Sequence, residues 1–397
     1  MKFIHVSDTH LGCKTPIEYD EIREKDFLNA FKQVIDFAIE KKVDFIIHSG
    51  DLFDEMFKLS GDLLLEVVKE LAKLKANNIY FISIKGNHDI KRSRLKAFEI
   101  LKHSGLIFEV NKEPFILDNV YINGVSEPKD LGDEKLRIYY KAIFKKITPD
   151  NDKFSIFISH TVPKELFDYS DPRVISITDL PQGFDYYAFG HFHIKQEPLE
   201  KEGSLYVLPG STERTEISKR EENAEKGFYF YNNGKLNFVK IKVRKIKVYE
   251  NVVFEKEEVD RIIEKIIENG KDVLIKLKVL TDDNIKDLLR NAIANLKTAG
   301  FLILYEEYVS RKKEKEIKFN NIGTIETFDS LIDSLIKEEL KKYFRENLKE
   351  VEDLVDKILE IYDTFGAERL REWLNNKVKK PYFGTATLKQ RTLLDLW

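Results

Sequence analysis

The sequence predicts an α/β fold that is divided over more than one domain. Short apolar runs of strand length alternate with helical patterns over residues 1–243. These runs are Phe3–Val6, Phe45–Ile47, Tyr80–Ile84, Phe154–Ile158 and Tyr186–Phe189. Each is followed by a polar cluster containing Asp, Asn or His, and open α/β sheets carry their ligand sites at such strand ends. The 397 residues exceed what one ordinary core encloses, so two or three domains are expected.

Two further patterns follow the fifth run. A hairpin is predicted over residues 228–238, because Tyr and Phe alternate on both sides of the turn Asn232-Asn233-Gly234. From about Arg244 the alternation begins again, with helices predicted over 255–269 and 282–299 and strands over 272–280 and 301–308. We therefore expect a first domain over residues 1–243 and a small α/β domain over residues 244–310.

The last part of the chain has a different character. Residues 311–318 are highly charged and lack periodicity, which predicts a linker over residues 311–325. A helical region is predicted over 326–380, because apolar residues recur at helical spacing from Phe328 to Tyr362. A tail over 381–397 follows. Too little core surrounds these helices for independent folding, so we expect them to dock on a partner.

Composition excludes several classes of protein. The formal net charge of −3 argues against a strongly basic surface, so any contact with nucleic acid must rest on local patches and bound metal. Cys13 is the single cysteine, which excludes a disulfide framework. No secretory signal is visible, and no apolar run approaches the roughly 20 residues of a membrane helix. The expected location is cytoplasmic.

Five motifs indicate metal chemistry. They are Asp8-x-His10, Gly50-Asp51-x-x-Asp54, Gly86-Asn87-His88-Asp89, His160 after a strand, and Gly190-His191-x-His193. A single Asp-x-His or His-x-His is more often a solvated turn than a ligand pair. All five in this order, however, resemble the motifs of the calcineurin-like metallophosphoesterases. Phosphate ester hydrolysis at such sites uses two divalent ions roughly 3.5–4 Å apart.

The motif residues suggest how two ions would be shared. A carboxylate offers two oxygens and an imidazole one nitrogen per ion, so Asp51 suits a bridging position. The resemblance implies that Asp8, His10, Asp51 and His193 hold one ion and that Asp51, Asn87, His160 and His191 hold the other. Mixed nitrogen and oxygen ligands suit manganese, iron or zinc better than magnesium. We expect two Mn²⁺ ions per chain, with other divalent transition metals compatible.

The remaining motif residues have other expected roles. The resemblance implies that His88 stabilises the charge on phosphorus and protonates the leaving oxygen, with Asp54 orienting its ring. Asp54 could instead cap a helix beginning at residue 55. Asp89 is left without a role. Of the other histidines, His5 and His48 are expected to be buried structural residues and His103 a surface residue.

The amino-acid sequences of three segments resemble those of one nuclease family in particular. His5–Gly12, Gly50–Asp54 and Pro209–Arg214 are similar to the meiotic-recombination-eleven family, over about residues 1–244. The resemblance implies a two-sheet β-sandwich flanked by helices. It also implies a manganese-dependent DNA nuclease for double-strand-break repair, with 3′ to 5′ exonuclease and single-strand or hairpin endonuclease activity.

The same resemblance implies partners. Residues 244–310 correspond in place and size to a DNA-binding capping domain. Residues 326–380 correspond to the region that binds a coiled-coil ABC-type ATPase of the RAD-fifty kind. Family members form homodimers through helices, for which Leu63–Leu74 and Leu95–Leu101 are the candidates here. Their apolar residues could instead face the domain's own core.

Two groups of residues outside the motifs are candidate contacts. Lys91, Arg92 and Arg94 follow the third motif and could neutralise a DNA phosphate, or could be solvated charges at a helix start. In the tail, Gln390, Leu393, Leu396 and Trp397 resemble the motif that binds the sliding clamp PCNA, although an aromatic residue is usual where Leu396 stands. A short helix packed on the ATPase or on this chain is the alternative.

Two other functions remain open. A calcineurin-like phosphatase or small-molecule phosphodiesterase would explain the metal motifs but would leave the C-terminal regions without a purpose. A scaffold that has lost catalysis would usually lack ligands, and this chain lacks none of them.

Overall fold

The computed structural model describes residues 1–54, 59–90, 96–111, 113–129, 131–253, 255–281 and 283–309. Several predictions fall outside these residues. They concern Lys91, Arg92 and Arg94, the linker, the helical region and the tail with its clamp-like motif. No helix within the described part of the chain is long and apolar enough to cross a membrane.

The first sheet has the order β14-β13-β1-β2-β3-β4. Its strands are β1 Lys2–Val6, β2 Phe45–His48, β3 Tyr80–Ser83, β4 Phe108–Glu109, β13 Gly227–Asn232 and β14 Lys235–Lys240. The strands β1 to β4 run parallel, and the predicted hairpin β13–β14 adds to the edge of β1 in antiparallel register, with Phe3 opposite Tyr231. The predicted strands of this sheet are thus present.

The second sheet has the order β11-β12-β10-β7-β6-β5. Its strands are β5 Phe115–Leu117, β6 Val120–Val125, β7 Phe154–Ser159, β10 Tyr186–Phe189, β11 Leu199–Lys201 and β12 Ser204–Val207. A two-stranded sheet of β8 Val162–Pro163 and β9 Val174–Ile175 lies in the segment after β7.

The two sheets pack face to face, which confirms the expected sandwich. The ring of Phe3 lies 5.1 Å from Phe45 on the next strand and 5.1 Å from Tyr186 of the second sheet. Both sheets contribute to one buried apolar cluster between them. Strands buried on both faces read as continuous apolar runs, which is why the sequence reveals them.

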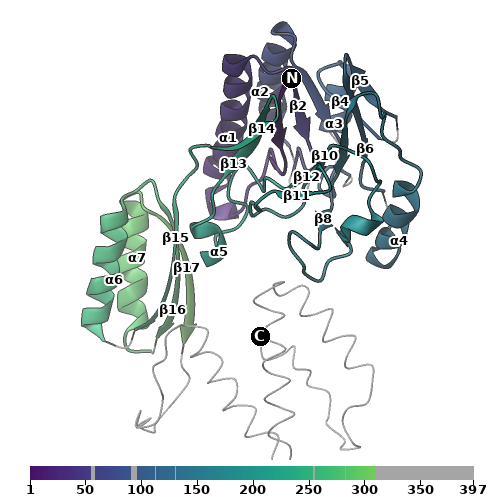
Figure 1. The fold of residues 1–397 in the computed structure, drawn as a ribbon. Coiled ribbons are helices and arrows are strands. Elements are labelled where there is room, and N and C mark those ends of the chain that lie inside the picture. Colours follow the sequence, from purple (N-terminus) through teal and green to yellow (C-terminus); the bar gives the residue numbers. More distant parts are fainter. Residues whose placement is uncertain are drawn as a thin grey trace, which may run out of the picture. The chain divides into compact units, whose positions relative to one another are not determined.

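Helices cover the outer faces (Figure 1). The helices α1 Asp20–Lys41, α2 Gly61–Ala76 and α3 Ala97–His103 pack on the first sheet, and α4 Asp133–Phe144 packs on the second. In α2, Leu63, Val67 and Leu71 are buried in the domain's own core, as are Phe98 and Leu101 of α3. The apolar stripe considered for a subunit contact therefore faces inward, and among the large apolar residues of these two helices Leu65 and Ile100 are exposed.

A third sheet follows in the chain. It has the order β15-β16-β17, with β15 Ile246–Val253, β16 Leu274–Thr281 and β17 Leu302–Val309. The helices α6 Lys256–Asn269 and α7 Lys286–Thr298 cover one face and enclose a separate apolar core (Figure 1). The elements expected after Arg244 are thus present, while the domain boundaries stay a prediction. The short elements are α5 Lys219–Glu222 and the 3₁₀ turns η1 Ile17–Tyr19 and η2 Ile177–Asp179.

Candidate metal centre

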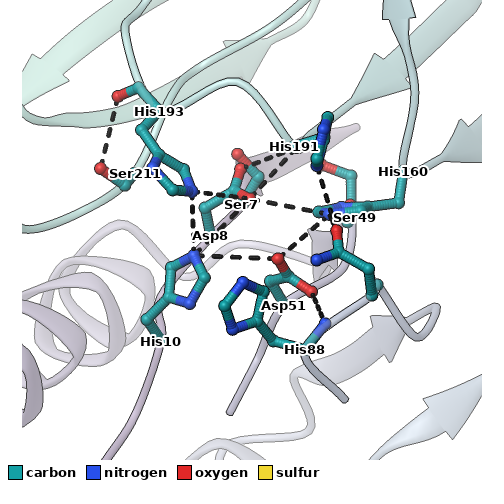
Figure 2. A network of polar contacts seen from close by, with 12 residues as sticks. Ser7, Asp8, His10, Ser49, Asp51, His88, His160, His191, His193 and Ser211 are labelled. Atoms are coloured by element: carbon teal, nitrogen blue, oxygen red, sulfur yellow. Dashed lines mark hydrogen bonds and ion pairs between the residues drawn. The ribbon is translucent and has the colours of Figure 1, made fainter. Parts of the chain in front are cut away.

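The five sequence motifs meet at the carboxyl ends of the central strands. Asp8 and His10 follow β1, Asp51 follows β2, Asn87 and His88 follow β3, His160 follows β7, and His191 and His193 follow β10. Figure 2 shows the aspartate and histidine side chains of these motifs pointing toward one another. The structure therefore brings together every motif residue that was predicted to act on metal or substrate.

Paired backbones hold the first two loops in place. The amide of Asp8 donates to the carbonyl of Gly50 at 3.1 Å, and the amide of His10 donates to Asp51 at 3.1 Å. The φ angles of Asp8, His10, Asp51 and His191 are 51°, 42°, 57° and 78°. Such left-handed backbone is unfavourable for residues other than glycine and clusters at functional sites. The chain adopts it here at four residues of one site.

One group of candidate ligand atoms comes from Asp8, His10 and His193. The Nε2 atoms of His10 and His193 face each other at 3.1 Å, and each lies about 4 Å from Oδ1 of Asp8 (4.0 and 3.9 Å). Two nitrogens bound to one ion at about 2.1 Å would lie roughly 3.0–3.4 Å apart. The observed spacing fits a shared divalent ion.

A second group lies beside it. Oδ2 of Asp51 is 3.2 Å from Nε2 of His160 and 3.8 Å from Nε2 of His10, so this carboxylate faces both groups. Oδ1 of Asn87 is 3.2 Å from Nε2 of His160 and 3.1 Å from Nδ1 of His191. Carboxylate, amide and imidazole atoms again face one another at the spacing of ligands around an ion. Both donor sets suit divalent transition metals.

The remote nitrogens of two histidines are already engaged. Nδ1 of His160 lies 2.8 Å from the carbonyl oxygen of Ser49, and since a carbonyl only accepts, this nitrogen carries the proton. Nδ1 of His193 lies 2.7 Å from the hydroxyl of Thr215. These contacts leave Nε2 of both rings directed into the centre, and such outer contacts orient metal-binding imidazoles.

His88 stands beside the candidate ligands. Its Nδ1 is 3.0 Å from Oδ1 of Asp54, and its backbone amide donates to Oδ1 of Asp51 at 2.8 Å. Asp54 does not cap α2, because α2 begins at Gly61 and the hydroxyl of Ser60 accepts from its first turn. A cap on residues 55–58 lies outside the described residues. Asp54 and His88 therefore form the expected pair.

Comparison with known proteins places this arrangement in a family. Residues 1–195 match the family model described as calcineurin-like phosphoesterase. A DNA double-strand break repair protein Mre11 from Sulfurisphaera tokodaii is 31% identical over 83% of this chain and 87% of its own length. The proteins of that name from Saccharolobus solfataricus and Sulfolobus acidocaldarius are 30% and 29% identical, over 86% and 91% of this chain and 90% and 100% of theirs. The chain belongs to the Mre11 family. It is a metal-dependent phosphodiesterase with a divalent metal cofactor.

Electrostatics in this Mre11-family centre favour cations. Burial alone would raise the pKa of Asp51, but neighbouring imidazoles, His160 first, hold it well below its usual value. Burial raises the pKa of Asp8. For His160, burial acts to lower the pKa, but Asp51 and Asp8 raise it to about 10. Two buried carboxylates thus depend on nearby positive charge, which bound divalent ions would supply.

The other histidines behave as expected. His5 and His48 are fully buried, and burial lowers the pKa of each to about 3. His5 contacts the hydroxyls of Tyr186 and Ser49, both at 3.0 Å. The side chain of His103 is 77% exposed. None of these three belongs to the ligand groups found among the described residues.

Three residues support the site, of which the sequence left Asp89 without a role and gave no indication of Lys226 and Asp171. Asp89 accepts from the amides of Leu52, Phe53 and Gly86 and so ties the second motif to the third. The buried ammonium of Lys226 donates to the carbonyl of His193 at 2.9 Å. Asp171 approaches His191. Asp89 stood within a recognised motif, whereas the other two carry no local signal.

Proposed function

We propose that this chain is a manganese-dependent DNA nuclease that processes DNA ends in double-strand-break repair. Its proposed activities are 3′ to 5′ exonuclease and single-strand or hairpin endonuclease. One observation supports this most strongly. Carboxylate, amide and imidazole groups, buried or half-buried, form two candidate ligand groups beside Asp51, in a chain whose archaeal relatives are DNA double-strand break repair proteins.

The proposed ligand sets follow the two groups. Asp8, His10, Asp51 and His193 hold one Mn²⁺, and Asp51, Asn87, His160 and His191 hold the other. Bound ions supply Lewis acidity for attack on the phosphodiester. The protein's part is to fix the ligand geometry, and the outer contacts of His160 and His193 support it.

His88 is the proposed acid. In the proposed ligand sets it is not needed as a ligand, and its ring stands next to His10 with centroids 4.7 Å apart. The carboxylate of Asp54 accepts from Nδ1 and favours the imidazolium, so Nε2 can donate to phosphate or to the leaving oxygen.

The proposed partners are DNA, a RAD-fifty-type ATPase and a second copy of this chain. Residues 244–310 are the proposed capping domain, and residues 326–380 the proposed ATPase-binding region. Lys91, Arg92 and Arg94 are proposed phosphate contacts. Leu65 and Ile100 are the proposed homodimer contacts, because they are exposed whereas Leu63, Leu71 and Leu101 are buried in the core.

A comparison of substrates tests the function. Purified full-length chain is incubated with Mn²⁺ or Mg²⁺ and labelled duplex DNA, hairpin DNA or an aryl phosphate ester. We expect DNA cleavage with Mn²⁺ and much less with Mg²⁺. Rapid cleavage of the aryl ester without DNA cleavage would favour a phosphatase instead. Binding of two ions without any hydrolysis would favour an inactive scaffold.

The tail is also a proposed contact, through Gln390, Leu393, Leu396 and Trp397, for the sliding clamp PCNA. Leucine and tryptophan side chains would fill an apolar pocket, with Gln390 hydrogen-bonding beside it. Calorimetric titration of a peptide of residues 380–397 into the clamp tests this. The absence of binding at about 100 μM would contradict it.

A further inference from the structure

His191 is contacted at both ring nitrogens. Its Nδ1 lies 3.1 Å from Oδ1 of Asn87, within the second ligand group. On the opposite side of the ring, Nε2 lies 3.4 Å from Oδ2 of Asp171. The imidazole is therefore placed between a candidate co-ligand and a carboxylate.

The chemistry of the two contacts assigns the tautomer that binds an ion. A nitrogen that binds a metal ion must offer its lone pair, and in neutral imidazole the other nitrogen then carries the proton. An ionised carboxylate only accepts hydrogen bonds, so Asp171 favours the proton on Nε2. The lone pair of Nδ1 is then directed toward Oδ1 of Asn87.

Asp171 is itself held in place by the protein. Its Oδ1 accepts from the backbone amide of Arg173 at 2.8 Å, and its carboxylate pairs with the Arg173 guanidinium at 3.5 Å. Arg173 is fixed in turn by the buried Glu127, at 2.7 Å. The loop also packs on the metal centre through Phe167, whose ring stacks on Phe192 at 4.1 Å. Phe192 stands between His191 and His193 in the chain.

Within the described part of the chain, no such carboxylate meets the remote nitrogen of His10, His160 or His193. The remote nitrogen of His160 meets a carbonyl oxygen, and that of His193 meets a hydroxyl. Nδ1 of His10 is buried without a hydrogen-bond partner among the described residues. A carboxylate raises the basicity of the imidazole that it contacts. Among the residues that the structure describes, only the group with Asn87 and His160 therefore has a carboxylate behind one of its imidazoles.

We propose that Asp171 is a positioning residue that selects Nδ1 of His191 as the ligand atom and strengthens binding of the ion held with Asn87 and His160. The two ions are then bound unequally in its absence. This inference rests on the ligand sets of the proposed function, and it assigns Asp171 no contact with substrate.

Titration with Mn²⁺, followed by electron paramagnetic resonance, tests the proposal on the full-length protein. The signal of free Mn²⁺ gives the concentration of unbound ion and hence the binding affinities. A single bound ion and an exchange-coupled pair of ions give different spectra. Asp171→Asn removes the charge but keeps an oxygen for the Arg173 amide, and Asp171→Ala removes both. The control is Asp168→Ala, an exposed carboxylate in the same loop.

We expect wild type and Asp168→Ala to bind two ions and to give the coupled spectrum. In both Asp171 variants the affinity for one ion should fall about 10- to 100-fold, the effect of losing an outer contact. The other ion should bind as in wild type. At limiting Mn²⁺ the spectrum of a single bound ion should then dominate. Excess Mn²⁺ should restore kcat, because the substitution raises the Mn²⁺ concentration needed for activity and does not change the fully loaded enzyme.

Three outcomes are distinguished. Unchanged affinity for both ions in Asp171→Asn and Asp171→Ala would overturn the proposal. Equally weaker binding of both ions in Asp171→Asn would also overturn it, since that indicates a general disturbance of the site. Thermal unfolding shows whether Asp171→Ala is folded. If that variant is not folded, the result for Asp171→Asn decides. If wild type binds fewer than two ions, the proposed ligand sets themselves fail.

Discussion

At the scale of single residues, the metal centre is built on unfavourable backbone. Left-handed conformations at Asp8, His10, Asp51 and His191 cost on the order of 1–3 kcal/mol each. The surrounding sheets and the hydrogen bonds between the loops offset this cost. In return, the side chains of these four residues lie close together in the metal centre.

The role of His88 can be separated from metal binding. We expect His88→Ala to reduce nuclease activity at least about 10²- to 10⁴-fold, the usual contribution of a general acid. Elemental analysis should still find near two ions per chain. His103→Ala, which removes an exposed imidazole, is the control and should be fully active. His88 also lies within ligand distance of His10 and Asp51, so loss of an ion in His88→Ala would make it a ligand instead.

Asp51 should behave differently, because its carboxylate faces both ligand groups. In Asp51→Ala we expect weaker binding of both ions and loss of activity. Calorimetric Mn²⁺ titration measures this, with the exposed Asp36→Ala on α1 as the matched control. Full occupancy at wild-type affinity in the Asp51 variant would show that it does not bridge.

At the scale of the elements, the loops approach so closely that glycine is required. A Cβ on Gly86 would lie 2.2 Å from Oδ1 of Asp51 and 2.6 Å from its backbone nitrogen. A Cβ on Gly190 would lie 2.5 Å from the carbonyl oxygen of Ser49. These glycines let the loops after β2, β3 and β10 meet.

The variant Gly86→Ala should therefore displace Asp51. We expect loss of activity and of at least one bound ion, because the backbone cannot move away without breaking the contacts of Asp89. Gly61→Ala is the control, since no atom lies within 4 Å of its added Cβ. Activity and ion content are measured side by side. Wild-type ion content in Gly86→Ala would show that the loops can adjust.

Strands were predicted correctly where their burial produces a continuous apolar run in the sequence. The central strands are apolar on both faces, so Phe45–Ile47 and Tyr186–Phe189 were recognisable. The short edge strands β5 and β11 were not predicted, because each has three residues, none of them buried, and so carries little pattern. The family resemblance, and not periodicity, supplied the arrangement of two facing sheets.

The candidate site shows the same division. Candidate ligand residues could be named because each follows a buried strand within a motif. Asp171 and Lys226 could not, because they meet His191 and His193 only through the folded arrangement of segments distant in the chain. Their residue types are common on surfaces, so sequence alone gives no reason to choose them.

At the scale of the whole molecule, catalysis and partner binding are expected to separate. A chain truncated at about Ile322 should keep Mn²⁺-dependent nuclease activity, because both ligand groups lie before that residue. It should lose the ATPase, because the predicted docking region over residues 326–380 is removed. Co-purification with the ATPase measures this, and undiminished affinity of the truncated chain would place the docking site elsewhere.

The position of β1 in the first sheet has a consequence for synthesis of the chain. Phe3 pairs with Tyr231, so one edge of the first strand stays open until β13 has been translated. At roughly 5–20 residues per second this takes about ten seconds or more. His191 and His193 also emerge late. A nascent chain on the ribosome thus exposes an unpaired strand edge while it cannot yet hydrolyse a phosphodiester.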